Sequence, residues 1–272
     1  MKGREAMLQK LLSTIPEEYE KIVVDDEDLL LAAKRNKGAK KATGEYLLFI
    51  DDDNYLASGV IEEMLSEFKK KIGVMGMTAC YDDKKMKVAD GGSKRNYLTG
   101  FTSGFYTNEL IYEIPYSLIY QVDEVANAFM IPRHVFEEVG GFDEVNFPID
   151  LDEADLCKRI KDMGYQIVMN PKAICYHKSQ TYSPVPDFRR PFNAYTMGRN
   201  KVYYQRKHLS FIAYSVYLIC FFWMTPFFYS VSLLYRGKLK ILFYFLWGVI
   251  DGVFKPLMSK VPEAVFGNTK ME

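Results

Sequence analysis

The stretch Gly44-Glu-Tyr-Leu-Leu-Phe-Ile-Asp-Asp-Asp53 joins a run of apolar residues to three consecutive carboxylates. The apolar run predicts a buried strand over 45–50, because short apolar runs bounded by glycine are typical of strands inside a sheet. Side chains alternate along an extended backbone, so Asp51 and Asp53 are expected to point the same way. Their oxygens suit Mg²⁺ or Mn²⁺, which also binds diphosphates. A solvated acidic turn that caps the next helix is the alternative interpretation.

Strand and helix patterns alternate on both sides of this stretch. Helices are expected over 7–15, 29–42, 60–68, 132–139 and 152–163, and strands over 21–24, 45–50, 72–78, 125–131, 165–169 and 173–176. The glycine-, serine- and threonine-rich residues 91–104 are expected to form a loop. The alternation predicts an α/β fold with a mostly parallel sheet flanked by helices. Such sheets bind ligands at the carboxyl ends of their strands, where the three aspartates stand.

The composition excludes some classes of protein. The chain has 272 residues, of which 49% are hydrophobic, and its 35 Lys and Arg balance its 35 Asp and Glu. A general nucleic-acid binder needs a basic surface, so no nucleic-acid partner is expected. The four cysteines lack zinc-site or CxxC spacing, which favours a reducing, cytoplasmic setting. The first ten residues are polar and contain no signal-peptide core.

The composition changes after Lys207. Residues 210–235 carry no charge, although Pro226 interrupts them, and as a helix they are long enough to cross a hydrocarbon core of about 30 Å. Basic residues flank this run on both sides and give no orientation. A second apolar run, 241–250, is too short to span and is expected to be interfacial or re-entrant.

These patterns predict two parts, a catalytic domain over 1–190 and a basic linker with membrane-associated hydrophobic helices over 191–272. The alternative is a buried helical hairpin in a soluble protein.

A second acidic group, Asp150, Asp152, Glu153 and Asp155, stands at the start of the helix expected over 152–163. Acids at this position cap a helix and complement its dipole. Alternatively, one of them projects into a cleft and takes the proton from a sugar hydroxyl as a general base.

Two further positions carry functional side chains. His177 follows the strand expected over 173–176, where an imidazole is able to complete a metal shell or contact a diphosphate; a structural role is the alternative. Arg199 belongs to a basic cluster with Lys201, Arg206 and Lys207. Such a cluster either anchors a protein to anionic lipid or clamps a leaving diphosphate or a lipid phosphate.

Taken in order, these segments resemble the family-2 glycosyltransferases, especially rhamnosyltransferase-like enzymes, from Lys34 to about Gly252. The motifs that carry the resemblance are Ala33-Lys-Arg-Asn-Lys-Gly38, Ala42–Asn54, Val139-Gly-Gly-Phe-Asp-Glu144, Asp152-Glu-Ala-Asp-Leu-Cys-Lys-Arg159 with Gly164-Tyr165, His177, and Gly198-Arg-Asn200. The resemblance implies a GT-A fold and an enzyme that moves a sugar from a nucleotide-sugar donor to a lipid-linked or glycan acceptor. It also implies work at the cytoplasmic face of a membrane.

The resemblance further implies roles for individual residues. Asp51 and Asp53 would bind the divalent metal, Mn²⁺ or Mg²⁺; Arg35, Asn36, Asp51, Asp52, His177 and Arg199 would bind the donor; and Glu153, beside Asp152, would be the catalytic base. The family usually has Glu before Asp at this pair, and this chain has the reverse order. The implied mechanism is a single displacement with inversion, in which metal and basic groups stabilise the departing nucleoside diphosphate.

The start of the chain departs from the family pattern. Members begin with a strand, a helix and a second strand ending in an Asp-containing turn, and these elements hold the base. Here Lys2-Gly-Arg-Glu-Ala-Met7 resembles the helix after that turn, so the first part of the nucleotide site is expected to be missing. A late-starting reading frame or a degenerate copy would explain this.

Two other functions stay open at this point. One is a catalytically inactive, membrane-associated scaffold derived from a glycosyltransferase. The other is a nucleotidyltransferase, which also uses paired aspartates but would need a glycine-rich phosphate loop near its start, and none is visible.

Overall fold

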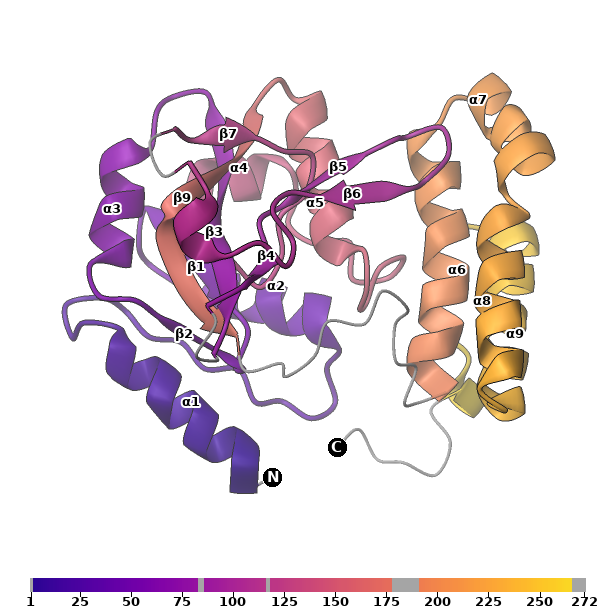
Figure 1. Ribbon diagram of the computed structural model, residues 1–272, viewed down its shortest axis with the longest axis horizontal. Coiled ribbons are helices and arrows are strands. Elements are labelled where there is room, and N and C mark those ends of the chain that lie inside the picture. The colour runs from indigo at the N-terminus through magenta and orange to yellow at the C-terminus, as the bar shows by residue number, and fades with distance from the viewer. Residues whose placement is uncertain (1, 83–85, 116–117, 178–190, 266–272) are drawn as a thin grey trace.

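The computed structural model describes residues 2–82, 86–115, 118–177 and 191–265. A sheet with helices on its faces forms one part, and the helices of the last third stand beside it (Figure 1). The fold class is therefore α/β with helices flanking the sheet, as the sequence predicted.

The helices and strands agree broadly with the sequence pattern. The helices are α1 (Lys2–Thr14), α2 (Leu31–Lys41), α3 (Val60–Glu67), α4 (Arg133–Glu138), α5 (Asp152–Asp162), α6 (Pro191–His208), α7 (Phe211–Val216), α8 (Met224–Tyr235) and α9 (Leu239–Phe254), with a π-helical turn at Tyr217–Phe221. The strands are β1 (Tyr46–Ile50), β2 (Asn54–Leu56), β3 (Ile72–Tyr81), β4 (Val88–Asp90), β5 (Ser93–Arg95), β6 (Thr102–Gly104), β7 (Tyr120–Gln121), β8 (Ala128–Pro132) and β9 (Gln166–His177).

The main sheet is mixed, so the prediction of a mostly parallel sheet is wrong. Its strand order is β1-β8-β3-β9-β2, with β4 beside β3 and β7 beside β9. Among the pairings of the described residues, that of β3 with β9 is parallel and the others are antiparallel. A parallel neighbour requires a crossover, usually a helix. The chain between β3 and β8 instead makes short strands and returns in the opposite direction.

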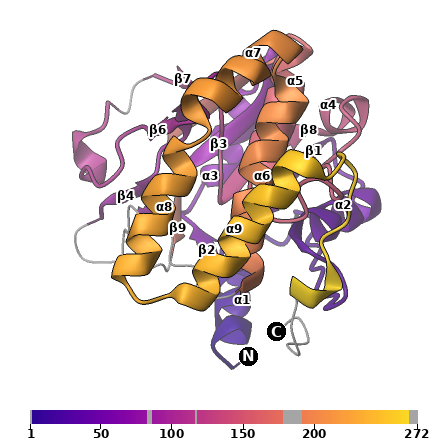
Figure 2. The same ribbon diagram turned by 90° about the vertical axis from the view of Figure 1, so that its right-hand side faces the viewer.

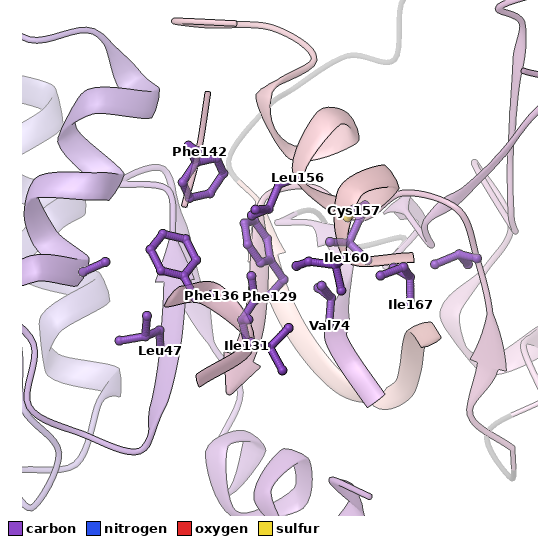
Figure 3. Packing of buried hydrophobic residues seen from close by; sticks show 14 of the residues in the cluster. Leu47, Val74, Phe129, Ile131, Phe136, Phe142, Leu156, Cys157, Ile160 and Ile167 are labelled. Carbon is purple, nitrogen blue, oxygen red and sulfur yellow. The ribbon is translucent and has the colours of Figure 1, made fainter. Parts of the chain in front are cut away.

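Apolar side chains cover both faces of this sheet. On one face, Val74, Phe129 and Ile131 of the strands point toward Leu156 and Ile160 of α5 (Figure 3). The helical spacing of the buried α5 residues is the one that the sequence predicted. On the other face, α3 packs on β3 and β9. The first of these clusters packs α5 against the sheet that contains β1.

Three local predictions are corrected. Residues 21–24, expected as a strand, lie outside every described strand, with Val23 exposed. The expected loop over 91–104 contains a small antiparallel hairpin of β5 and β6. The expected strands 165–169 and 173–176 are one strand, β9, whose register against β3 shifts between Asn170 and Ile174. Pro171 and Lys172 lie in this bulge and separate two apolar runs, so the sequence pattern predicted two strands.

The last third forms a layer of helices in which α6 lies between the sheet domain and the hairpin of α8 and α9 (Figures 1 and 2). Residues 211–235 are long and apolar enough to cross a membrane, with a mean hydropathy of 1.7, and few of them are buried. The predicted division of the chain at residue 190 lies at the edge of 178–190, outside the described residues.

Candidate active site

A buried arginine connects three of the predicted motifs. Arg35 projects from α2, and its Nη2 lies 2.7 Å from Oδ1 of Asp51, which follows β1 directly. The same Nη2 is 2.8 Å from Oε1 of Glu153, and Nη1 is 2.6 Å from Oδ2 of Asp152. Asp152 and Glu153 form the first turn of α5. The guanidinium fork matches carboxylate geometry, so one side chain orients three acids.

Asn36, the next residue on α2, binds the glycine turn before the acidic helix. Its Nδ2 donates to the Phe142 carbonyl at 2.9 Å and to Oε2 of Glu144 at 2.9 Å, and its Oδ1 accepts from the Phe142 N–H at 2.9 Å. Asn36 therefore fixes this turn to α2. A direct contact with the donor, which the resemblance implied, stays a prediction.

The other end of the aspartate triplet faces β9. Asn54 lies opposite His177 in the pairing of β2 with β9. This register brings Nε2 of His177 to 3.3 Å from Oδ2 of Asp53. The Asn54 amide also donates to Oδ1 of Asp53 at 3.0 Å. The structure thus brings together the predicted histidine and one predicted metal-binding aspartate.

The sequence analysis expected Asp51 and Asp53 to point the same way along an extended strand. In the structure they do not. Residues 51–53 form a turn in which the Asn54 N–H donates to the Asp51 carbonyl at 3.1 Å, so the alternation of a strand does not apply. Within the described ranges, no group of three His, Cys, Asp or Glu side chains is arranged to hold a metal ion. Asp51 faces Arg35, whereas Asp53 faces His177; Asp52, between them, is partly exposed.

Two further acids, Asp90 and Glu124, line a pocket together with Glu153. Asp90 ends β4 and accepts hydrogen bonds from the Gly92 N–H at 2.9 Å and the Asn127 amide at 3.4 Å. A pocket of about 130 Å³ opens between the acids; it is lined by Asp90, Ser93, Glu124, Val125, Ala126, Leu151, Glu153 and Ala154. The sequence analysis missed Asp90 and Glu124. The sequence signals that could have identified them are the two glycines that follow Asp90 and the buried apolar run that follows Glu124.

Burial raises the pKa values of these acids. It raises the pKa of Asp51 and Asp90, and it raises that of Asp152 well above its ordinary value, with the Glu153 charge adding to the effect. Burial also raises the pKa of Asp150 to about 6. Burial thus disfavours the charged form of these carboxylates. Arg35 offsets this at Asp51 and Asp152, and Arg95 pairs with Glu124 at the other side of the pocket.

Helix α6 holds the turn that starts α5. Asp150 and Leu151 have φ angles of 60° and 64°, in the left-handed region that non-glycine residues avoid at a cost of about 1 kcal/mol each. The Asn200 amide donates to the carbonyls of Ile149, at 2.7 Å, and Asp150, at 3.0 Å, and the Thr196 hydroxyl donates to Oδ2 of Asp150 at 2.9 Å. These bonds stabilise the strained turn.

The structure does not bring Arg199 to the carboxylates around Arg35. Its side chain is fully buried, and Nη2 donates to the Asn146 carbonyl at 2.8 Å, while its guanidinium lies over the Tyr203 ring. Asn146 in turn accepts the Met258 N–H at Oδ1, 2.7 Å away. Arg199 is therefore a positioning residue that joins α6 to the loop before the acidic helix.

Asp155 also orients the helices rather than facing the pocket. Its carboxylate binds Arg159 at 2.8 Å, Lys207 at 2.7 Å and Nε2 of His208 at 2.8 Å. Burial opposes its ionisation, but these three partners together lower the pKa of Asp155 to about 2. The charge therefore ties α5 to the end of α6.

Comparison with known proteins gives the same fold. Residues 5–212 match the family described as "Glycosyltransferase like family 2". The "Uncharacterized protein y4gI" of Sinorhizobium fredii is 23% identical over 185 residues, which cover 63% of this chain and 20% of that protein, so the chain spans about a fifth of this relative's length.

Two solved structures match this chain to different degrees. The mannosyltransferase PcManGT from Pyrobaculum calidifontis, in complex with GDP-Man and Mn²⁺, has a TM-score of 0.50 at 14% identity, covering 93% of this chain and 75% of its own. The structure of GalNAc-T7 with UDP, GalNAc and Mn²⁺ has a TM-score of 0.48 at 15% identity, covering 69% of this chain and 39% of its own. With three motifs of the sequence meeting at Arg35 and the family matched over residues 5–212, the chain belongs to glycosyltransferase-like family 2 and has a GT-A-like fold.

Proposed function

We propose that this protein transfers a sugar from a nucleotide-sugar donor to a hydroxyl of an acceptor, with inversion at the anomeric carbon. One observation carries the proposal: buried Arg35 holds Asp51, Asp152 and Glu153 in a single cluster at the end of β1. Family membership supports the reaction class, and the PcManGT complex with GDP-Man supports a nucleotide-sugar donor.

Glu153 is the proposed general base. Its side chain is 17% exposed and lines the pocket, whereas that of Asp152 is 1% exposed, and Oδ1 of Asp152 has no hydrogen-bond partner among the described residues. An acceptor is thus able to reach Glu153 and not Asp152. Glu153 takes the acceptor proton as the hydroxyl oxygen bonds to the anomeric carbon. The bond from that carbon to the diphosphate oxygen breaks, and the nucleoside diphosphate leaves with the electron pair.

Asp53 and His177 are the proposed metal ligands, with Asp51 beside them. A half-exposed carboxylate 3.3 Å from an imidazole offers the oxygen and nitrogen donors that Mn²⁺ accepts. The divalent cation, when bound, supplies positive charge against the diphosphate. Asp51 or the partly exposed Asp52 is proposed to contact the ribose.

The acceptor is proposed to be lipid-linked or a glycan, and the enzyme to work at the cytoplasmic face of a membrane. The apolar run 211–235 supports the attachment, and four free cysteines support the reducing compartment.

The test is nucleoside-diphosphate release and product formation by the full chain with a panel of nucleotide sugars, with Mn²⁺ or EDTA. Asp53→Ala is expected to abolish metal-dependent release, and Glu153→Gln to lower transfer by at least about a hundredfold. Asp162→Asn, an exposed acid on the same helix, is the matched control and should retain activity. The anomeric configuration of the product tests inversion. A folded protein without turnover on any donor would favour the inactive scaffold.

A further inference from the structure

The C-terminal helices present a continuous apolar face away from the sheet domain. On α9, the exposed side chains recur every three or four residues, at Leu239, Phe243, Leu246, Ile250 and Phe254. On α8, the exposed residues include Phe227, Phe228, Val231 and Leu234. These spacings place one stripe along each helix, so the apolar face runs parallel to the helix axes.

The inner side of α9 is fixed to α6 by direct backbone contact. A Cβ at Gly248 would lie 2.1 Å from the Tyr195 carbonyl oxygen, and one at Gly198 would lie 2.4 Å from that of Phe245. The Tyr195 hydroxyl also donates to Asp251 at 2.6 Å, and Arg206 donates to the Gly252 carbonyl at 2.8 Å. The two helices therefore form one unit.

Helix α6 is equally fixed to the catalytic domain. In addition to its bonds to the turn at Asp150, its Gln205 amide donates to the Tyr97 carbonyl at 2.8 Å, and Lys207 lies 2.7 Å from Asp143. If α9 crossed a bilayer, it would draw α6 and the polar groups bonded to it toward hydrocarbon. Each charged group there costs several kcal/mol, so this arrangement is strongly disfavoured.

Charge identifies the surface that this face fits. Residues 191–250 contain no Asp or Glu, whereas the turn between the apolar helices α8 and α9 and the start of α9 carry Arg236, Lys238 and Lys240. Apolar helices bordered by cations bind the interface of anionic bilayers.

We propose that α7, α8 and α9 lie in the plane of one leaflet of an anionic bilayer and do not cross it. The inference rests on the proposed membrane attachment and adds its geometry. Residues 211–235, although long enough to span, are immersed lengthwise at the boundary of headgroups and acyl chains. Helix α6 then connects the sheet domain to the helices that contact the membrane.

Trp223 reports the depth directly. It is the central residue of 211–235 and is 67% exposed. The chain has two tryptophans, and the other, Trp247, packs on Tyr195. A full-length Trp247→Phe variant, bound to vesicles of phosphatidylglycerol and phosphatidylcholine, therefore fluoresces from Trp223 alone. A spanning helix puts this residue at the midplane, whereas an in-plane helix puts it near the headgroups.

The experiment compares quenching by lipids brominated near the headgroup with quenching by lipids brominated near the methyl end. Stronger quenching by the shallow bromines is expected. Stronger quenching by the deep bromines would overturn the in-plane geometry while leaving membrane attachment standing. Absence of vesicle binding would overturn both, and a soluble dimer broken by Phe243→Glu would then identify a second copy as the occupant of this face.

A matched pair of variants checks that the apolar face makes the contact. Phe243→Glu, on the outer face of α9, is expected to weaken vesicle binding roughly tenfold or more. Tyr112→Glu, at a similarly exposed aromatic residue in the 3-10 helix Ile111–Glu113, is expected to leave it unchanged. Equal binding by both variants would contradict the proposal. Catalytic turnover is not the readout, so failure of the proposed reaction and failure of in-plane docking are separate results.

Discussion

Arg35 on α2 and Glu153 on α5 lie 2.8 Å apart, Nη2 to Oε1. The proposed base is thus held by a buried cation that also binds two other acids. Such a contact fixes the direction of the Glu153 carboxylate relative to the pocket that it lines.

Arg35→Lys is expected to lower transfer by about a hundredfold or more, because an ammonium group cannot bind three carboxylates with the geometry of a guanidinium. Arg35→Ala should also lower the free energy of unfolding by about 3–5 kcal/mol, since it leaves buried acids unpaired. Urea denaturation and initial rates measure the two effects. Lys37→Ala, which removes an exposed ion pair on the same helix, should change neither.

Asp150→Asn is expected to change how stability depends on pH. Burial raises the pKa of Asp150 to about 6, above its ordinary value of 3.8, so between these values the folded state holds the proton more tightly than the unfolded state. The stability contribution of this group is therefore present below about pH 4 and is lost as pH rises to about 6, a loss of roughly 3 kcal/mol. Unfolding free energies at pH 4 and pH 7 should show a smaller decrease in the variant. An unchanged difference would contradict the buried environment described for Asp150.

His177→Ala is expected to raise the Mn²⁺ concentration needed for half-maximal turnover by about tenfold, because it removes one of two adjacent donors. Titration of activity with Mn²⁺ measures the effect. His134→Ala, on the exposed face of α4, is the control and should leave the metal dependence unaltered. If both variants respond alike, His177 is not a ligand.

Gly248→Ala is expected to destabilise the protein by about 1–3 kcal/mol, because its Cβ would lie 2.1 Å from the Tyr195 carbonyl oxygen and the helices would have to separate. Gly38→Ala, also within a helix, has ordinary contact distances and should stabilise by up to about 1 kcal/mol. Thermal unfolding of both variants distinguishes close helix packing from a general effect of alanine.

Strong periodicity made much of the fold predictable. The apolar run before the aspartates became β1, and the buried spacing of α5 was read correctly from Leu156 and Ile160. The prediction of a strand over 21–24 is wrong because an apolar run of three residues, Ile22 to Val24, carries no information about a partner strand. The β5–β6 hairpin was missed because its strands are polar and short.

The candidate site was predictable in its residues and less so in its connections. The motifs of the sequence contain Arg35, Asp51 and Glu153. The ion pairs of Arg35 with the two acids join residues far apart in the chain, and no local pattern predicts them. The motif Gly198-Arg-Asn200 and the basic cluster around it, which is able to clamp a diphosphate, predicted a donor contact for Arg199. Only packing reveals that this side chain is fully buried.

Asn146 makes contacts with residues that are synthesised much later in translation. The loop before α5 is contacted by Arg199 and by the backbone of Met258, which are both synthesised long after that loop. During translation the sheet domain emerges first. At that stage Arg199 and Met258, the contacts of Asn146, have not yet left the ribosome. The apolar helices emerge between Arg199 and Met258. The loop at Asn146 therefore gains its last contacts only after the apolar helices α7, α8 and α9 have been synthesised.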